Sequence, residues 1–225
     1  MIFTCLLIKD RMENFDLARI LKFLPGIIIG LTVHEFSHAL VAHMCGDSTS
    51  KDQGRITLNP LKHIDLLGFI MLIFAGFGWA KPVQFSEQNL RNPKRDVIKI
   101  ALAGPVSNAL IAMVLSVLFS LLNHLIPGFH GSATQILREV FLYAIYINWG
   151  LFIFNLIPLP PLDGSHVLFF QLKRFPSLYE GLYKYGSLLL FGLIIGTYFT
   201  KINLLPIWPA IQFLGEGFLS LVGYR

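Results

Sequence analysis

Long runs of apolar residues alternate with short polar stretches along the chain. The runs cover roughly residues 17–45, 64–80, 100–126, 137–158 and 185–222. A helix that spans the hydrocarbon core of a bilayer needs about 20 consecutive, mostly apolar residues. Run 185–222 is long enough for two such helices. The pattern therefore predicts an all-α polytopic membrane protein with about five transmembrane helices.

Two segments are predicted to differ from these helices. The apolar run 64–80 is short and is interrupted by Gly68, Gly76 and Gly78. Polar and apolar residues alternate over 55–58, which favours a short strand. We expect a strand there to end at the following Asn-Pro pair, because proline disrupts the pairing of backbone groups.

Composition strengthens the membrane interpretation. Hydrophobic residues make up 54% of the 225 residues and charged residues only 14%, and the mean hydropathy is +0.63. Ordinary soluble domains carry about 25% charged residues, so this class is excluded. The net charge of +5 indicates loops that face anionic lipid, and no basic helix favours nucleic-acid binding.

Three polar residues inside the first apolar run have metal-binding spacing. On a helix, His34 and His38 lie one turn apart on the same face. Glu35 is placed to reach a metal-bound water without being a ligand itself. This is the HExxH arrangement of zinc hydrolases. The alternative is a polar patch that only holds helices together, but packing does not require three such residues in hydrocarbon.

A zinc site that keeps one position open for water needs a third protein ligand. Asp163 is the candidate, because it closes the segment NLIPLPPLDG after an apolar run. The prolines of this segment prevent a regular helix, and irregular backbone at membrane depth is buried in protein or lines a cavity. An Asp-Gly turn that merely caps a helix is the alternative interpretation.

One ion cannot be held from opposite sides of a bilayer, and this constrains the topology. His34 and His38 lie toward the C-terminal end of their run, and Asp163 follows the C-terminal end of 137–158. The two helices must therefore be parallel, which requires an odd number of crossings between them. We predict that 64–80 is re-entrant or interfacial, with 100–126 as the single crossing. Counting basic residues by the positive-inside rule fits either topology.

These motifs resemble the site-2 protease family of zinc intramembrane metalloproteases. The family's HExxH and Leu-Asp-Gly signatures read HEFSH and NLIPLPPLDG here, and Gly104 to Asn108 resembles its central GxxxN element. The resemblance implies one Zn²⁺ ion held by His34, His38 and Asp163, with Glu35 as the general base. It also implies that Asn108 is a polar group near the substrate or oxyanion.

Two further segments are candidates for substrate binding. Asn155 shares a helix face with Asn148, and we expect it to line the cleft. The strand-like segment 52–62 is expected either to pair with an extended substrate by β-addition or to be a plain connector.

The expected function is therefore zinc-dependent hydrolysis of peptide bonds in transmembrane protein substrates, by a single integral-membrane protease domain over 1–225. Its catalytic core covers about 17–172, and a helical hairpin covers about 185–222. A zinc-binding transporter would need ligands repeated along a path, and a non-catalytic scaffold would not need Glu35. The expected location is a prokaryotic plasma membrane, with the zinc site toward the cytoplasm and no nucleic-acid partner.

Overall fold

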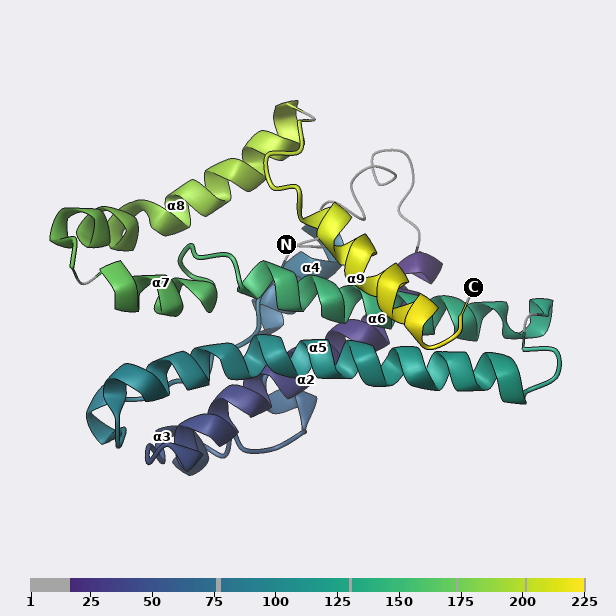
Figure 1. Cartoon of the computed structure of the whole chain (residues 1–225), viewed down its shortest axis with the longest axis horizontal. Coiled ribbons are helices and arrows are strands. Elements are labelled where there is room, and N and C mark those ends of the chain that lie inside the picture. The colour runs from purple at the N-terminus through teal and green to yellow at the C-terminus, as the bar shows by residue number, and fades with distance from the viewer. Residues whose placement is uncertain (1–16, 76–77, 130, 173, 201, 225) are drawn as a thin grey trace.

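The computed structural model describes residues 17–75, 78–129, 131–172, 174–200 and 202–224. Within these ranges the chain is helical, and the only β-pairing is one isolated bridge. The elements in chain order (Figure 1) are α2 (Leu17–Met44), α3 (Thr49–Asp52), η1 (Pro60–Lys62), α4 (Leu66–Ala75), η2 (Glu87–Asn89), α5 (Pro93–Leu125), η3 (Ser132–Thr134), α6 (Gln135–Asn155), α7 (Gly164–Leu172), α8 (Pro176–Thr200) and α9 (Ile207–Leu221).

Helices α2, α5 and α6 pack together and form the core of the protein. Three helical stretches in the described residues are long and apolar enough to cross a membrane: Ala18–Met44, Pro93–Leu125 and Ser132–Asn155. The predicted all-α membrane class is confirmed. The expected total of about five crossings stays a prediction.

Helices α2 and α6 lie side by side and run in the same direction. A Cβ added to Gly26 would meet the Ala144 Cα at 2.6 Å, and four residues later a Cβ added to Gly30 would meet the Asn148 Oδ1 at 2.9 Å. A step of four residues toward the C-terminus of α2 corresponds to a step of four residues toward the C-terminus of α6. Only parallel helices show this pattern. The parallel arrangement predicted from the shared depth of the metal-binding residues is therefore confirmed.

Helix α5 runs antiparallel to both of them. The His38 side chain, near the end of α2, bonds to the Ile100 carbonyl, near the start of α5, whereas the Gly30 carbonyl bonds to Asn108, about two turns further along α5. Figure 1 shows α5 and α6 side by side over most of their length. Helix α5 is thus the crossing that returns the chain between the two parallel helices.

Segment 64–80 enters and leaves the bundle at one level. Helix α4 has 10 residues, so it is about 15 Å long at 1.5 Å per residue, half the thickness of a bilayer core. Ile64 and Ala80 form the antiparallel bridge, and the Lys81 N–H donates to the His63 carbonyl at 2.7 Å. Because its two ends meet, the segment does not cross, as predicted.

The strand predicted over 55–58 is absent. Arg55 is 4% exposed and Leu58 is 61% exposed, which is the reverse of a strand that buries its apolar side. No described segment forms a ladder of backbone bonds with this stretch, and the Arg55 guanidinium is bound by backbone carbonyls instead. The alternation of residue types is therefore not a strand signal here.

The C-terminal region contains two helices, joined through residues 201–206. Helix α9 packs mainly against α6, whereas α8 contacts α7, and Figure 1 shows α8 leading away from the core. Two helices cover the region of the expected hairpin at about 185–222, with α8 beginning earlier, at Pro176, but they pack against different helices rather than along each other.

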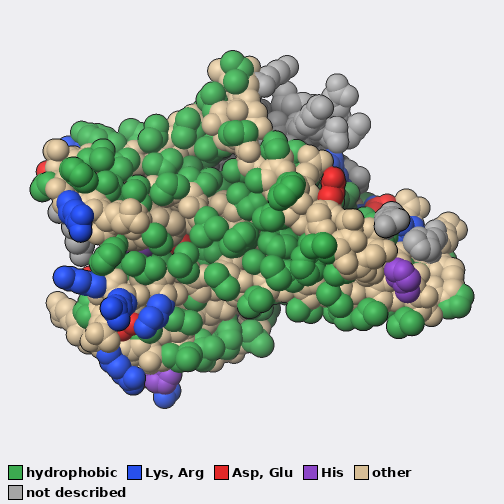
Figure 2. All heavy atoms as spheres, viewed as in Figure 1, with side chains coloured by type: hydrophobic (Ala, Val, Ile, Leu, Met, Phe, Trp, Pro, Cys, Tyr) green, Lys and Arg blue, Asp and Glu red, His purple; other side chains and the backbone are tan. Residues whose placement is uncertain are grey.

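Hydrophobic side chains cover most of the face shown in Figure 2, and Lys and Arg side chains gather at the end that carries α3 and the start of α5. Exposed basic residues at this end are Lys51, Arg91, Lys94 and Arg95. An apolar middle with a basic end is the surface expected of a protein embedded in a membrane.

Candidate metal centre

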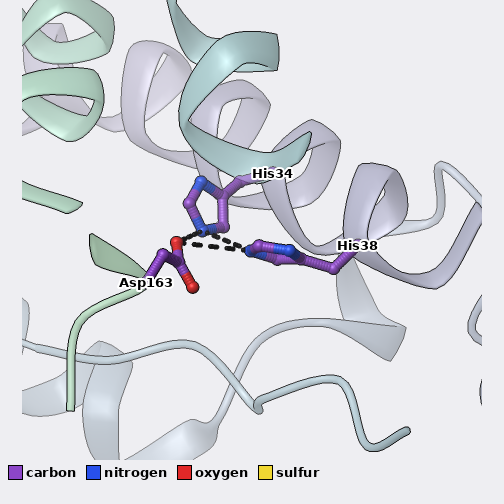
Figure 3. Close-up of side chains that lie close together, drawn as sticks. All are labelled: His34, His38 and Asp163. Atoms are coloured by element: carbon purple, nitrogen blue, oxygen red, sulfur yellow. Dashed lines mark hydrogen bonds and ion pairs between the residues drawn. The ribbon is translucent and has the colours of Figure 1, made fainter. Parts of the chain in front are cut away.

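Three side chains from two distant parts of the chain meet in the core. His34 and His38 project from α2, and Asp163 lies in the loop between α6 and α7 (Figure 3). The Asp163 Oδ2 lies 3.1 Å from the His34 Nε2 and 3.4 Å from the His38 Nε2, and the two Nε2 atoms are 3.0 Å apart. Both histidines are buried.

The opposite ring nitrogens fix the tautomers of the two histidines. The His38 Nδ1 lies 2.7 Å from the Ile100 carbonyl oxygen, and the His34 Nδ1 lies 2.7 Å from the Asn108 Oδ1. Both partners accept hydrogen bonds, so each Nδ1 carries the proton and donates it. In the neutral rings each Nε2 then presents a lone pair toward Asp163.

The donor set therefore fits a cation. Within the part of the chain that the structure describes, no donor reaches the buried Asp163 Oδ2 in hydrogen-bond geometry, although the two imidazoles lie close to it. An anionic oxygen and two nitrogen lone pairs within 4.8 Å of one another match the ligands of tetrahedral zinc.

Gly104 of α5 leaves the space for this arrangement. A Cβ at this position would lie 2.3 Å from the His38 Nε2 and 2.6 Å from the His34 Nε2. Any larger residue would therefore occupy the volume that the imidazoles enclose. The glycine of the GxxxN element thus has a steric role at this centre.

Asn108 lies behind His34 and is fully buried. Its Nδ2 donates to the Gly30 carbonyl at 3.0 Å and to the Asn148 Oδ1 at 3.1 Å, so its Oδ1 must face His34. Asn148 is oriented in turn by donating to the Ala144 carbonyl at 2.8 Å. This position suits a residue that orients the imidazole better than one that contacts a substrate.

Glu35 is held by a loop and not by the helices that orient the two histidines. The residue is 8% exposed, and its Oε2 accepts a hydrogen bond from the Val83 N–H at 3.0 Å. Val83 belongs to the extended segment that follows the Ile64–Ala80 bridge. Sequence patterns do not reveal this contact, because the donor is a backbone group in a loop.

Asp47 anchors the far end of that loop to the end of α2. Its carboxylate accepts from the Ser86 N–H at 3.0 Å, the Asn89 Nδ2 at 2.8 Å and the Thr49 hydroxyl at 2.6 Å. Burial raises the pKa of Asp47, but these hydrogen bonds outweigh it and hold the pKa below its ordinary value. The Asp47 carboxylate therefore stays ionised and holds the loop at Ser86 and Asn89. Val83 of the same loop contacts Glu35.

Asn155 is the last residue of α6 and is half-buried. Its Nδ2 donates to the Leu151 carbonyl within the same helix at 3.0 Å. The residue stands eight positions before Asp163, at the start of the proline-containing loop. Its expected contact with substrate stays a prediction.

Comparison with known proteins agrees with this centre. The model of the family described as peptidase family M50 matches residues 122–191, a range that contains Asp163. The protein named "Putative zinc metalloprotease YwhC" of Bacillus subtilis is 38% identical over 159 residues, which cover 71% of this chain and 73% of that protein.

Two further relatives carry similar names. "Putative zinc metalloprotease MJ0611" of Methanocaldococcus jannaschii is 30% identical, covering 69% of this chain and 73% of its own. "Putative zinc metalloprotease Rip2" of Mycolicibacterium smegmatis is 30% identical, covering 64% of this chain and 55% of its own. No solved structure matches the chain. The extent of the match to YwhC places the chain in peptidase family M50, the family of site-2 proteases.

Proposed function

We propose that this protein is a zinc-dependent intramembrane endopeptidase that cleaves transmembrane protein substrates. The observation that carries the proposal is the convergence of His34, His38 and Asp163, with Glu35 next to His34, between helices apolar enough to cross a membrane. Ionisable groups at such a depth are costly, and they are typical of functional sites.

One zinc ion would be held by the Nε2 atoms of His34 and His38 and by the Asp163 carboxylate. Zinc bound in this way supplies Lewis acidity, which makes a water molecule a nucleophile near neutral pH and polarises a peptide carbonyl. Asn108 and the Ile100 carbonyl would hold the imidazoles in the tautomers that present Nε2 to the metal. We therefore assign Asn108 a role in orienting His34.

Glu35 would act as the general base that accepts the proton of the attacking water and passes it to the leaving amide nitrogen. The Val83 N–H occupies one carboxylate oxygen, the Oε2. This bond fixes the direction of the carboxyl plane, so the other oxygen is available for proton transfer. The adjacent position of Glu35 and His34 places the base next to the metal ligands without making it one.

The substrate backbone must be extended at the cleavage site, because carbonyls inside a helix are already hydrogen-bonded and inaccessible. A transmembrane helix would therefore unwind locally before hydrolysis. Asn155, at the end of α6, is proposed to contact the unwound backbone. The role proposed for 52–62 in β-addition is not supported, since Arg55 is buried there and no strand forms.

The rival function is a zinc-binding transporter or a non-catalytic scaffold. A transporter uses further ligands along a path. In the described residues, the only group of three or more potential His, Cys, Asp or Glu ligands is the one at His34, His38 and Asp163. A scaffold would not require the backbone donor that orients Glu35. Both observations favour the peptidase.

The test is a zinc and cleavage measurement on the purified full chain in lipid vesicles. We expect about one zinc ion per chain and cleavage of single-span model substrates inside their apolar segment, mapped by mass spectrometry. Chelation should remove both zinc and activity, and added zinc should restore them. Zinc binding with metal transport across the vesicle and no cleavage would instead establish the transporter.

We also propose that the metal centre lies toward the cytoplasmic side of a prokaryotic plasma membrane. The basic end of the protein, at α3 and the start of α5, supports this orientation by the positive-inside rule. With Cys5 and Cys45 replaced by serine, a Lys51→Cys variant is expected to react with a membrane-impermeant thiol reagent only after the membrane is opened. Labelling in intact cells would reverse the proposed orientation.

A further inference from the structure

Arg55 is a buried charge without a carboxylate partner among the described residues. The side chain and backbone of Arg55 together are 4% exposed, and Arg55 forms none of the ion pairs found among the described residues. Removing a guanidinium from water is costly unless its hydrogen bonds are replaced. Backbone carbonyls replace them here, from Lys62, Lys81 and Pro82.

These carbonyls come from both sides of the re-entrant segment. The Lys62 carbonyl precedes it, and the carbonyls of Lys81 and Pro82 follow it, next to the point where the Lys81 N–H meets His63. The planar guanidinium presents five N–H donors in a rigid fork. Arg55 therefore fixes how the chain leaves the re-entrant segment and where the next peptide units point.

The Pro82–Val83 peptide connects Arg55 to Glu35. Its oxygen accepts from the Arg55 Nη2 at 2.9 Å, and its N–H donates to the Glu35 Oε2 at 3.0 Å. The carbonyl and the N–H belong to one rigid plane and point in opposite directions. Fixing the oxygen from one side therefore aims the N–H at the carboxylate on the other side.

We propose that Arg55 is a positioning residue that holds Glu35 in its working orientation through the Pro82–Val83 peptide. The positive charge also polarises this peptide, which strengthens the hydrogen bond to the Glu35 carboxylate. The inference rests on the proposed function, because it assumes that Glu35 is the base. It assigns a role to a buried charge that the metal centre itself does not use.

A purely structural role for Arg55 makes different predictions. If Arg55 only stabilised the loop, its loss would change substrate binding and yield of folded protein along with turnover. If it acts through Glu35, turnover falls while zinc content and KM are retained. The two roles are therefore separated by the split between kcat and KM and by coupling to Val83.

The experiment compares variants of the full chain in vesicles. Arg55→Met removes the charge and the donors, Arg55→Lys keeps the charge, and Arg91→Met is the matched control at an exposed arginine. We expect Arg55→Met to lower kcat about 100-fold, the loss that can follow when a reacting group is misplaced by about 1 Å. Zinc per chain and KM should stay within about twofold, and Arg55→Lys should recover part of the loss.

Val83 provides a second test that leaves Arg55 intact. Val83→Pro removes the N–H, whereas Val83→Ala keeps it and serves as the reference. Relative to that reference, Val83→Pro should lower kcat as much as Arg55→Met does. The double variant should be no slower than Val83→Pro alone, because both changes break one connection.

Amide hydrogen exchange gives a readout that does not depend on turnover. The Val83 amide should exchange slowly in the native protein and quickly in Arg55→Met and in Glu35→Ala, while the amides of α5 are unchanged. Unaltered kcat, multiplicative losses in the double variant, or unaltered Val83 exchange would overturn the positioning role. Absence of any cleavage by the unmodified protein would instead refute the proposed function, and the exchange data alone would then decide the role of Arg55.

Discussion

Replacing Glu35 with glutamine is expected to lower peptide-bond cleavage by roughly 10²- to 10⁴-fold, the usual contribution of a general base. Glutamine has the same shape and can still accept the Val83 N–H through its amide oxygen, so the packing around α2 is preserved. It cannot accept the proton of the attacking water. Because Glu35 is not among the three converging ligand atoms, zinc per chain should remain at the native value.

The measurement is cleavage of a single-span substrate in vesicles together with metal analysis of the same preparation. Glu180→Gln is the matched control, because Glu180 is exposed on α8. This variant should cleave the substrate at the native rate. Native cleavage by Glu35→Gln would refute the assignment of the base. Loss of zinc from this variant would instead make Glu35 a ligand, which contradicts the proposed geometry.

The motif on α2 could be predicted because it depends only on local geometry. The spacing of His34 and His38 fixes their common face as soon as the segment is helical, and helicity follows from the long apolar run. Glu35 is placed by the same turn of helix. No knowledge of the other helices is needed to bring these three residues together.

Asp163 was predicted from its own segment, and the requirement that one ion be held at one depth then constrained the topology. That requirement made α2 and α6 parallel and left 64–80 as the segment that does not cross. The structure shows both features, through the contacts of Gly26 and Gly30 with α6 and through the bridge between Ile64 and Ala80. Metal geometry predicted the topology where the charge distribution fitted two alternatives.

The burial of Arg55 could not be predicted from the pattern of residue types. Alternation over 55–58 predicts a strand only if a partner strand exists, and residue types do not reveal that partner. The burial of Arg55 is decided by carbonyls from two other parts of the loop. Backbone groups carry no sequence signature, so neither this cluster nor the Val83 contact to Glu35 could be predicted.

Asn108 illustrates a related difficulty. The resemblance identified the residue, but whether its amide faces the substrate or His34 depends on the rotation of α5 about its axis. That rotation is set by close packing, with Gly104 against the imidazoles and Asn108 against Gly30 and Asn148. Identity of a polar residue is thus easier to predict than the direction it faces.

The second large effect is expected from Gly104→Ala, which adds one methyl group to α5. That carbon would lie 2.3 Å from the His38 Nε2 and 2.6 Å from the His34 Nε2, close to the zinc–nitrogen distance of about 2.0–2.1 Å. The methyl group and the ion would therefore compete for one small volume. We expect zinc affinity to fall by about 100-fold or more, at the upper end of losses caused by residues behind metal ligands, and cleavage to be lost with it.

Gly192→Ala provides the matched control, because a Cβ there has no neighbour within 4 Å and the residue also lies inside a helix, α8. Alanine is favoured over glycine in a helix interior by about 0.5–1 kcal/mol, so both variants gain the same helix stability. Only Gly104→Ala has a steric cost. Zinc affinity is measured by competition with a chelator, and folding by thermal unfolding of the zinc-free protein. A Gly104→Ala protein that binds zinc as tightly as the Gly192→Ala protein would mean that the ion does not sit between α5 and the imidazoles of α2.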